Sequence, residues 1–279
     1  MGYYRRYSLI YYTIALLCGA LWLWMALVGS DSNFFVGLLL FFLVICLTAF
    51  FCSLAATRRF QAAIQRLMQT ADIASFLQEL NGCAKSSRRN TYNTILFWQV
   101  YALQLAGNLQ RAADLLQHAD PNYARSARSK KNDRCAYSVR CASLALQLGQ
   151  LDLADTHIES LRQELRTLQS DRALYPHYTK CLTDLAEMSA ILRGEGSGQS
   201  LYFSNLLKLS SSLVDRVQTS YYLGIALIRE GKVDEAVKAL RDSAQGAPKL
   251  LASRRAAALL EHPDALQSGQ IDAFLFSEL

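Results

Sequence analysis

Residue types that catalyse reactions or bind metals are scattered along this sequence instead of being grouped. The histidines have no cysteine or carboxylate at the spacing of a metal site. They are His118, His157, His177 and His262. The stretch GEGSGQS, residues 194–200, is rich in glycine, but no lysine follows it directly, so phosphate binding is not expected there. We therefore expect no metal, no cofactor and no catalytic residue, and an enzyme with dispersed catalytic groups is the alternative.

Positive charge is concentrated in the stretch ARSARSKKNDR, residues 124–134. Its cations are Arg125, Arg128, Lys130, Lys131 and Arg134, and only Asp133 opposes them. A basic loop near a bilayer can contact anionic lipid, at about 1 kcal/mol per charge, and a basic patch can also contact RNA. No aromatic residue is interleaved with the cations, so a nucleic-acid partner is not expected. The simplest interpretation is a solvated loop between two helices.

The composition is that of a membrane protein. Of the 279 residues, 52% are hydrophobic and 19% are charged. The stretches 7–30 and 32–57 contain no charged side chain, and each exceeds the roughly 20 residues that a helix needs to cross a bilayer. We predict two spans, at residues 8–29 and 34–56, joined by the short connection GSDSN. Residues 1–57 would then form a two-helix transmembrane hairpin.

The charges that flank these spans predict their orientation. Arg5 and Arg6 precede the first span, Arg58 and Arg59 follow the second, and the connection between the spans has no Lys or Arg. Positively charged flanks stay on the cytoplasmic side, so we expect both termini to be cytosolic. The tight hairpin and the lack of a targeting signal favour the bacterial cytoplasmic membrane.

Three later stretches share one spacing of small and apolar residues. In each, a glycine is followed by alanine five positions later and preceded by a small or apolar residue seven positions earlier. The glycines are Gly107, Gly149 and Gly231, the alanines are Ala112, Ala154 and Ala236, and the earlier residues are Val100, Ala142 and Gly224. Glycine provides the left-handed conformation that ends a helix, and small residues allow two helices to approach closely. The pattern predicts helical hairpins that stack into an α-solenoid.

The last of these stretches, YYLGIALIREGKVDEAVKALRDSAQGAP, resembles a tetratricopeptide repeat. The pair Leu223-Gly224, Gly231, Ala236 and the terminal Pro248 match the signature of that family. The earlier two stretches carry the pattern more weakly. Between them and the last, Gly194 is followed by no alanine at the fifth position, and Glu187 stands where a small residue is expected, so we interpret this region as a degenerate helical pair.

The chain is thus predicted to be all-α, with four parts. A juxtamembrane helical connector, residues 58–89, follows the transmembrane hairpin. Residues 90–248 form the tetratricopeptide-like helical domain, and residues 249–279 form a C-terminal capping helix and tail.

The resemblance implies a surface for a protein partner on the inner face of the first helix of each hairpin. By helical offset, this face carries Phe97, Trp98, Tyr101, Arg140, Ser143, Tyr222 and Arg229. Aromatic residues and arginines together suit a segment with apolar anchors and acidic groups. We therefore expect a membrane-tethered adaptor that holds a cytosolic protein or peptide, and the small residues in the spans offer another membrane protein a second contact. The alternatives are a membrane-associated regulator or enzyme, or a lipid or RNA binder that acts through residues 124–134.

Overall fold

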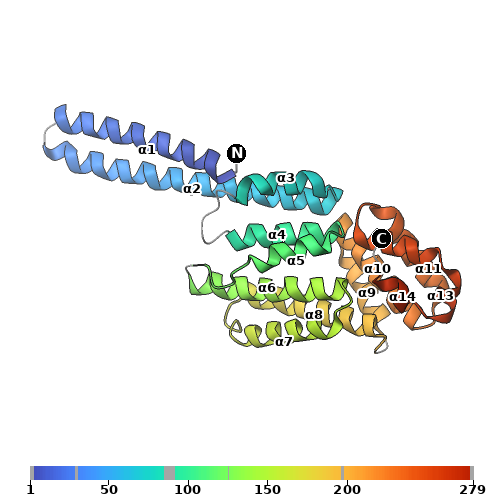
Figure 1. Ribbon diagram of the computed structural model, residues 1–279. Coiled ribbons are helices and arrows are strands. Elements are labelled where there is room, and N and C mark those ends of the chain that lie inside the picture. The colour runs from blue at the N-terminus through green and yellow to red at the C-terminus, as the bar shows by residue number, and fades with distance from the viewer. Residues whose placement is uncertain (1–2, 29–30, 85–91, 125, 196–197, 277–279) are drawn as a thin grey trace. The chain divides into compact units, whose positions relative to one another are not determined.

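The chain is all-helical in a computed structural model that describes residues 3–28, 31–84, 92–124, 126–195 and 198–276. These residues form fourteen α-helices and no strand, which confirms the all-α prediction (Figure 1). The helices are α1 Tyr3–Val28, α2 Asp31–Thr70, α3 Ile73–Ala84, α4 Tyr92–Leu105, α5 Leu109–Gln117, α6 Ala127–Gln147, α7 Leu151–Arg166, α8 Leu174–Arg193, α9 Gln199–Leu209, α10 Leu213–Arg229, α11 Val233–Gly246, α12 Leu251–Leu260, α13 Pro263–Ser268 and α14 Asp272–Leu275.

The chain divides into two compact units. The first comprises Met1–Gln65 with Gln78–Ser87, and the second comprises Arg66–Leu77 with Arg88–Leu279. The first unit therefore contains α1 and most of α2. The second contains Arg66–Leu77 and the helices α4 to α14, and we call this whole unit the helical domain.

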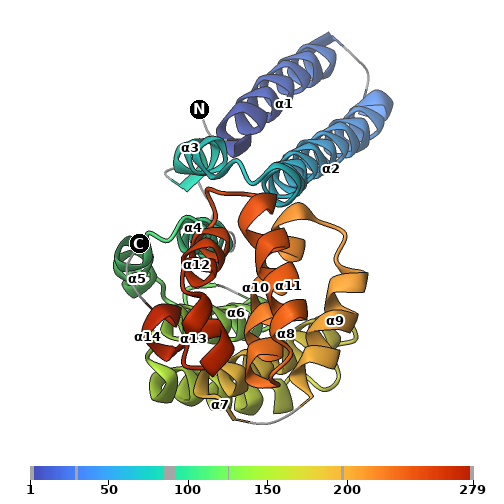
Figure 2. The ribbon, with the colours of Figure 1, turned by 90° about the vertical axis from the view of Figure 1, so that its right-hand side faces the viewer.

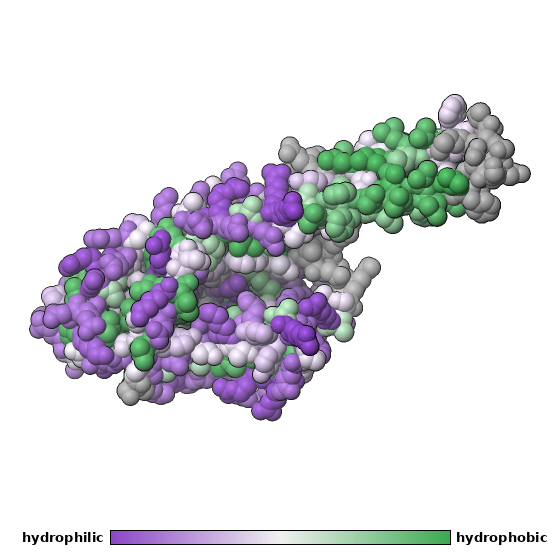
Figure 3. Space-filling model, turned by 180° about the vertical axis from the view of Figure 1, so that it is seen from behind, coloured by the Kyte–Doolittle hydropathy of each residue, from purple (hydrophilic) through white to green (hydrophobic). Residues whose placement is uncertain are grey.

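Among the described residues, one helical segment, which lies mostly in the first unit, is long and apolar enough to cross a membrane. This segment is Val36–Thr70 of α2; its most apolar 18 residues have a mean hydropathy of 2.8, and none of those 18 is buried. The apolar stretch Leu9–Trp24 of α1 is shorter. Figure 3 shows hydrophobic side chains over the surface of this unit. The hydroxyl groups of Thr13 and Thr48 donate to carbonyl oxygens one turn earlier, at 2.9 and 2.7 Å, so these polar groups are satisfied within their own helices.

The helix α2 continues without interruption from the apolar segment to Thr70. It ends at Ala71, whose φ of 53° lies in the left-handed region. Asp72 then begins α3, because its carboxylate accepts a hydrogen bond from the Ser75 backbone N–H at 3.2 Å. Asp72 thus caps the start of α3, and the residues after Thr57 extend the second apolar helix.

Glycine turns join the helices of the pairs α4–α5, α6–α7 and α10–α11. Gly107, Gly149 and Gly231 have φ values of 77°, 73° and 75°, a conformation that a side chain disfavours. In each turn the backbone N–H of the residue after the glycine donates to the carbonyl of the residue four positions before the glycine. These bonds, each 2.9 Å long, join Asn108 to Leu103, Gln150 to Ala145 and Lys232 to Leu227. They satisfy carbonyls at the helix end in the pattern of a Schellman motif, as the sequence predicts.

Small residues lie where the two helices of a pair cross. Ala112, Ala154 and Ala236 are completely buried. In the pair α10–α11 the helices approach so closely that a Cβ on Gly224 would lie 2.6 Å from Leu240 Cδ2. The spacing of small residues therefore has the packing role that was predicted for it.

The pair α8–α9 is built differently. Gly194 ends α8 with a φ of 71°, but α8 then packs against α6 and α7, whereas α9 packs against α10. Glu187 and Gln199 occupy the two positions that are small in the other pairs. Long side chains bridge these two helices instead: the Tyr202 hydroxyl on α9 donates to the Asp184 carboxylate on α8. This separation leaves space beside α6 and α10.

The C-terminal helices close the helical domain by returning to its first helices. The guanidinium of Arg254 on α12 donates to the Ala106 carbonyl after α4, and that of Arg255 donates to the Gln147 carbonyl at the end of α6, both at 2.8 Å. Figure 2 shows α12 beside α4. Cations at helix C-termini satisfy free carbonyls and interact favourably with the helix dipole. In the tail, Ile271 and Leu275 are completely buried.

Candidate functional site

A cavity of about 650 Å³ lies within the helical domain, lined by residues of α4, α6, α8, α9 and α10 and by Met68. Figure 3 shows a hollow on this face of the domain. Six of the seven residues that the sequence predicts for partner binding line this cavity. They are Phe97, Trp98, Tyr101, Arg140, Ser143 and Tyr222. The cavity exists because α8 and α9 do not close into a tight pair.

Two aromatic rings lie beside Arg140 in the cavity. The Arg140 guanidinium carbon lies 4.4 Å from the centroid of the Tyr101 ring and 5.9 Å from that of Trp98. The two rings meet edge to face with their centroids 5.7 Å apart, and Trp98 also meets Phe76 in this way at 6.3 Å. Cation–π contact holds the guanidinium in a fixed position. Burial lowers the pKa of Arg140 and raises that of Tyr101, but an arginine remains charged at any physiological pH.

The carboxylates that line the cavity have partners other than Arg140. Asp184 accepts a hydrogen bond from Lys180 at 2.8 Å and another from Tyr202. Asp215 accepts one from the Ser212 hydroxyl at 2.6 Å, where Ser212 caps the start of α10. Asp184 is therefore paired with a cation, whereas Asp215 is hydrogen-bonded to a neutral hydroxyl, and neither carboxylate pairs with Arg140.

Sequence reasoning missed the wall of the cavity that α8 provides. This wall is formed by Tyr178, Cys181, Leu185 and Met188. These residues are spaced by three, four and three positions, which is the signal of one helix face. The degenerate glycine pattern around Gly194 hid this signal, since the position of the inner face was inferred from that pattern.

Arg229 does not line the cavity, unlike the other six residues of the predicted set. Its guanidinium pairs with Asp272 on α14 and donates to the Ile191 carbonyl at 3.4 Å. Arg229 thus joins the end of α8 to the C-terminal tail. The other six residues of the same helical offset line the cavity, but the offset could not anticipate that the tail returns to Arg229.

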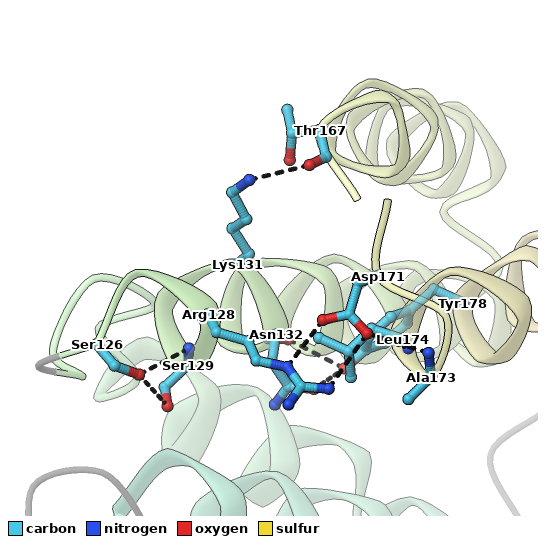
Figure 4. A network of polar contacts seen from close by, with 10 residues as sticks. All are labelled: Ser126, Arg128, Ser129, Lys131, Asn132, Thr167, Asp171, Ala173, Leu174 and Tyr178. Carbon is cyan, nitrogen blue, oxygen red and sulfur yellow. Dashed lines mark hydrogen bonds and ion pairs between the residues drawn. The ribbon is translucent and has the colours of Figure 1, made fainter. Parts of the chain in front are cut away.

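The basic stretch 124–134 is mostly helical, which corrects the prediction of a loop. Ser126 caps α6 by accepting a hydrogen bond from the Ser129 N–H at 3.1 Å, so the cations from Arg128 onward lie on the first turns of that helix (Figure 4). Arg125 lies outside the described residues.

Three of these cations are bound within the domain. Arg128 forms an ion pair with Asp171 at 2.8 Å, Lys131 donates to the Thr167 carbonyl at 2.9 Å, and Arg134 donates to Asn122 at 3.0 Å. Figure 4 shows Arg128 and Lys131 directed toward the segment between α7 and α8. The contacts of Arg128 and Lys131 thus join the start of α6 to the segment between α7 and α8.

No protein-family model, curated protein or solved structure matches this chain. Within the described ranges, no three His, Cys, Asp or Glu side chains are grouped so that they could hold a metal ion. The function is therefore inferred from the side chains that line the cavity.

Proposed function

We propose that this protein is a membrane-tethered adaptor whose helical domain holds a segment of a partner protein in the cavity around Arg140. In this proposal α1 and α2 cross the membrane as a hairpin, and the helical domain is a tetratricopeptide-like solenoid on the cytosolic side. The positive flanks Arg5, Arg6, Arg58 and Arg59 support this orientation, and a bacterial cytoplasmic membrane is the proposed location.

The observation that carries the proposal is the convergence of Trp98, Tyr101, Arg140 and Tyr222 from three helices on one cavity. Aromatic side chains and arginine dominate the binding energy of protein interfaces. Tethering would keep the domain in a thin layer beside the bilayer, so that a modest affinity suffices for recruitment.

The described residues favour neither a lipid nor an RNA site at the start of α6. Three of the cations there already bind groups of the helical domain. They contribute to its packing, and we therefore assign partner binding to the cavity alone.

Trp98→Ala is expected to weaken partner capture by about 30-fold, because removing a buried aromatic anchor costs roughly 2 kcal/mol or more. The measurement is chemical crosslinking in intact cells followed by identification and quantitation of the captured protein. Tyr175→Ala provides the control, since Tyr175 is an aromatic residue on α8 that does not line the cavity.

A second variant separates binding from folding. Ser143→Leu places a larger side chain in the cavity from a different helix and so fills part of it. This variant should also abolish capture, while its thermal unfolding temperature stays close to that of the wild type. If both variants capture the same protein as well as the wild type does, the cavity is not the docking site.

A further inference from the structure

Arg140 is the one cation of the cavity wall that pairs with no carboxylate of the described residues. Lys180, the other cation of the wall, is bound to Asp184 at 2.8 Å. A partly buried guanidinium without a counter-ion is costly in free energy, and its planar donors match a carboxylate. The local chemistry therefore calls for an anion from outside the chain.

The cavity is elongated along α6, and Arg140 lies near its middle. Residues of α6 line it from Asn132 to Gln147, a distance of about 22 Å at 1.5 Å per helical residue. Arg140 is eight residues from one end of this stretch and seven from the other. An extended peptide of roughly seven residues spans the same distance, and its central side chain would then lie opposite Arg140. A chain terminus would reach Arg140 only by leaving half of the cavity empty.

The remaining wall suits an extended backbone between apolar side chains. Gln147 and Gln218 place side-chain amide groups in the wall of the cavity. Amide groups of this kind can pair with the free N–H and C=O groups of an extended chain, which a helix satisfies internally. Leu209, 80% exposed, lines the cavity on α9 and offers apolar contact to flanking residues.

We propose that the segment held in the cavity is an extended, mainly apolar peptide with one acidic side chain near its centre, and that Arg140 binds this carboxylate beside the rings of Trp98 and Tyr101. This inference rests on the proposed function and adds the chemistry of the ligand. Arg140 is then the specificity-determining residue, while the aromatic and aliphatic walls supply most of the buried area.

Two pools of heptapeptides test this inference on the full-length protein in detergent. Both pools are acetylated and amidated, so that they carry no terminal charge, and both are randomised over Gly, Ala, Val, Leu, Phe and Ser at all positions except the fourth. The fourth residue is glutamate in one pool and glutamine in the other. We expect the wild type to retain the glutamate pool at least tenfold better, because a charge-assisted hydrogen bond is stronger than a neutral one.

Arg140→Gln should remove this preference, and Arg140→Lys should retain part of it because the charge remains. Lys208→Gln removes an exposed cation of α9 that does not line the cavity and should leave the preference unchanged. Thermal unfolding of each variant establishes that it is folded.

The outcomes separate this inference from the proposed function. Equal retention of both pools by the wild type, or an unchanged preference in folded Arg140→Gln, overturns the role of Arg140 while peptide binding stands. Retention of neither pool contradicts both proposals. Displacement of the retained glutamate pool by dodecanoate at equal concentration would assign the cavity to a fatty acid and likewise overturn the inference.

Discussion

Gly224→Val is expected to destabilise the helical domain by about 3 kcal/mol or more, a large share of the roughly 5–15 kcal/mol that stabilises a typical domain. A Cβ at this position would lie 2.6 Å from Leu240 Cδ2 and 2.7 Å from Leu240 Cγ. Leu240 is completely buried, so it has no free space to move into, and α10 and α11 must separate. Thermal unfolding of the full-length protein in detergent, followed by circular dichroism, measures the effect.

Gly231→Ala is the matched control for this prediction. Gly231 lies in the turn between the same two helices, but a Cβ there would meet no atom within 4 Å. Only its φ of 75° opposes a side chain, at a cost of roughly 1–2 kcal/mol. If the two variants unfold at the same temperature, the close approach of α10 and α11 is not what requires glycine at position 224.

Replacing both Leu43 and Leu47 with arginine is expected to release most of the protein from the membrane. Both side chains are exposed on the apolar part of α2, near the centre of the proposed second span. An arginine at the centre of a span costs about 3 kcal/mol, so the two together cost on the order of 6 kcal/mol. The fraction of the protein that stays with the membrane after carbonate extraction reports this loss.

Thr57→Arg should leave that fraction unchanged. Thr57 is also exposed on α2 but directly precedes Arg58 and Arg59, where a further positive charge lies at the membrane interface and costs little. Full membrane retention of the double variant would contradict a span centred on these leucines.

The local structure of the helical domain could be predicted from sequence because glycine and alanine act through short-range geometry. Gly107 adopts a left-handed conformation irrespective of what lies further along the chain, and Ala112 permits a close crossing with the helix that immediately precedes it. Most of the predicted site followed from the same geometry, since residues spaced by three and four positions share a helix face.

Contacts between distant parts of the chain could not be predicted in this way. Arg254 binds the carbonyl of Ala106, 148 residues earlier, and Arg229 binds the tail through Asp272. No local pattern distinguishes such arginines from exposed ones. The cations of the basic stretch 124–134 were predicted to be solvated for the same reason: the partners of Arg128 and Lys131 are more than 30 residues away in sequence.

The cavity itself arises from a failure of the repeat pattern. Glu187 and Gln199 occupy positions that are small in the other helical pairs, and α8 and α9 accordingly pack against different helices. A degenerate repeat is therefore the sequence signal that could have indicated a site, because it marks the pair that cannot close.

Site-specific photo-crosslinking from α9 in intact cells tests the docking cavity most directly. A photoreactive amino acid at Leu209, which is exposed and lines the cavity, should yield one discrete adduct with a partner protein, and Arg140→Gln should abolish it. The same amino acid at Leu201, which is exposed on the same helix but does not line the cavity, should yield none. The absence of an adduct from Leu209, or the same adduct from both positions, would contradict the account.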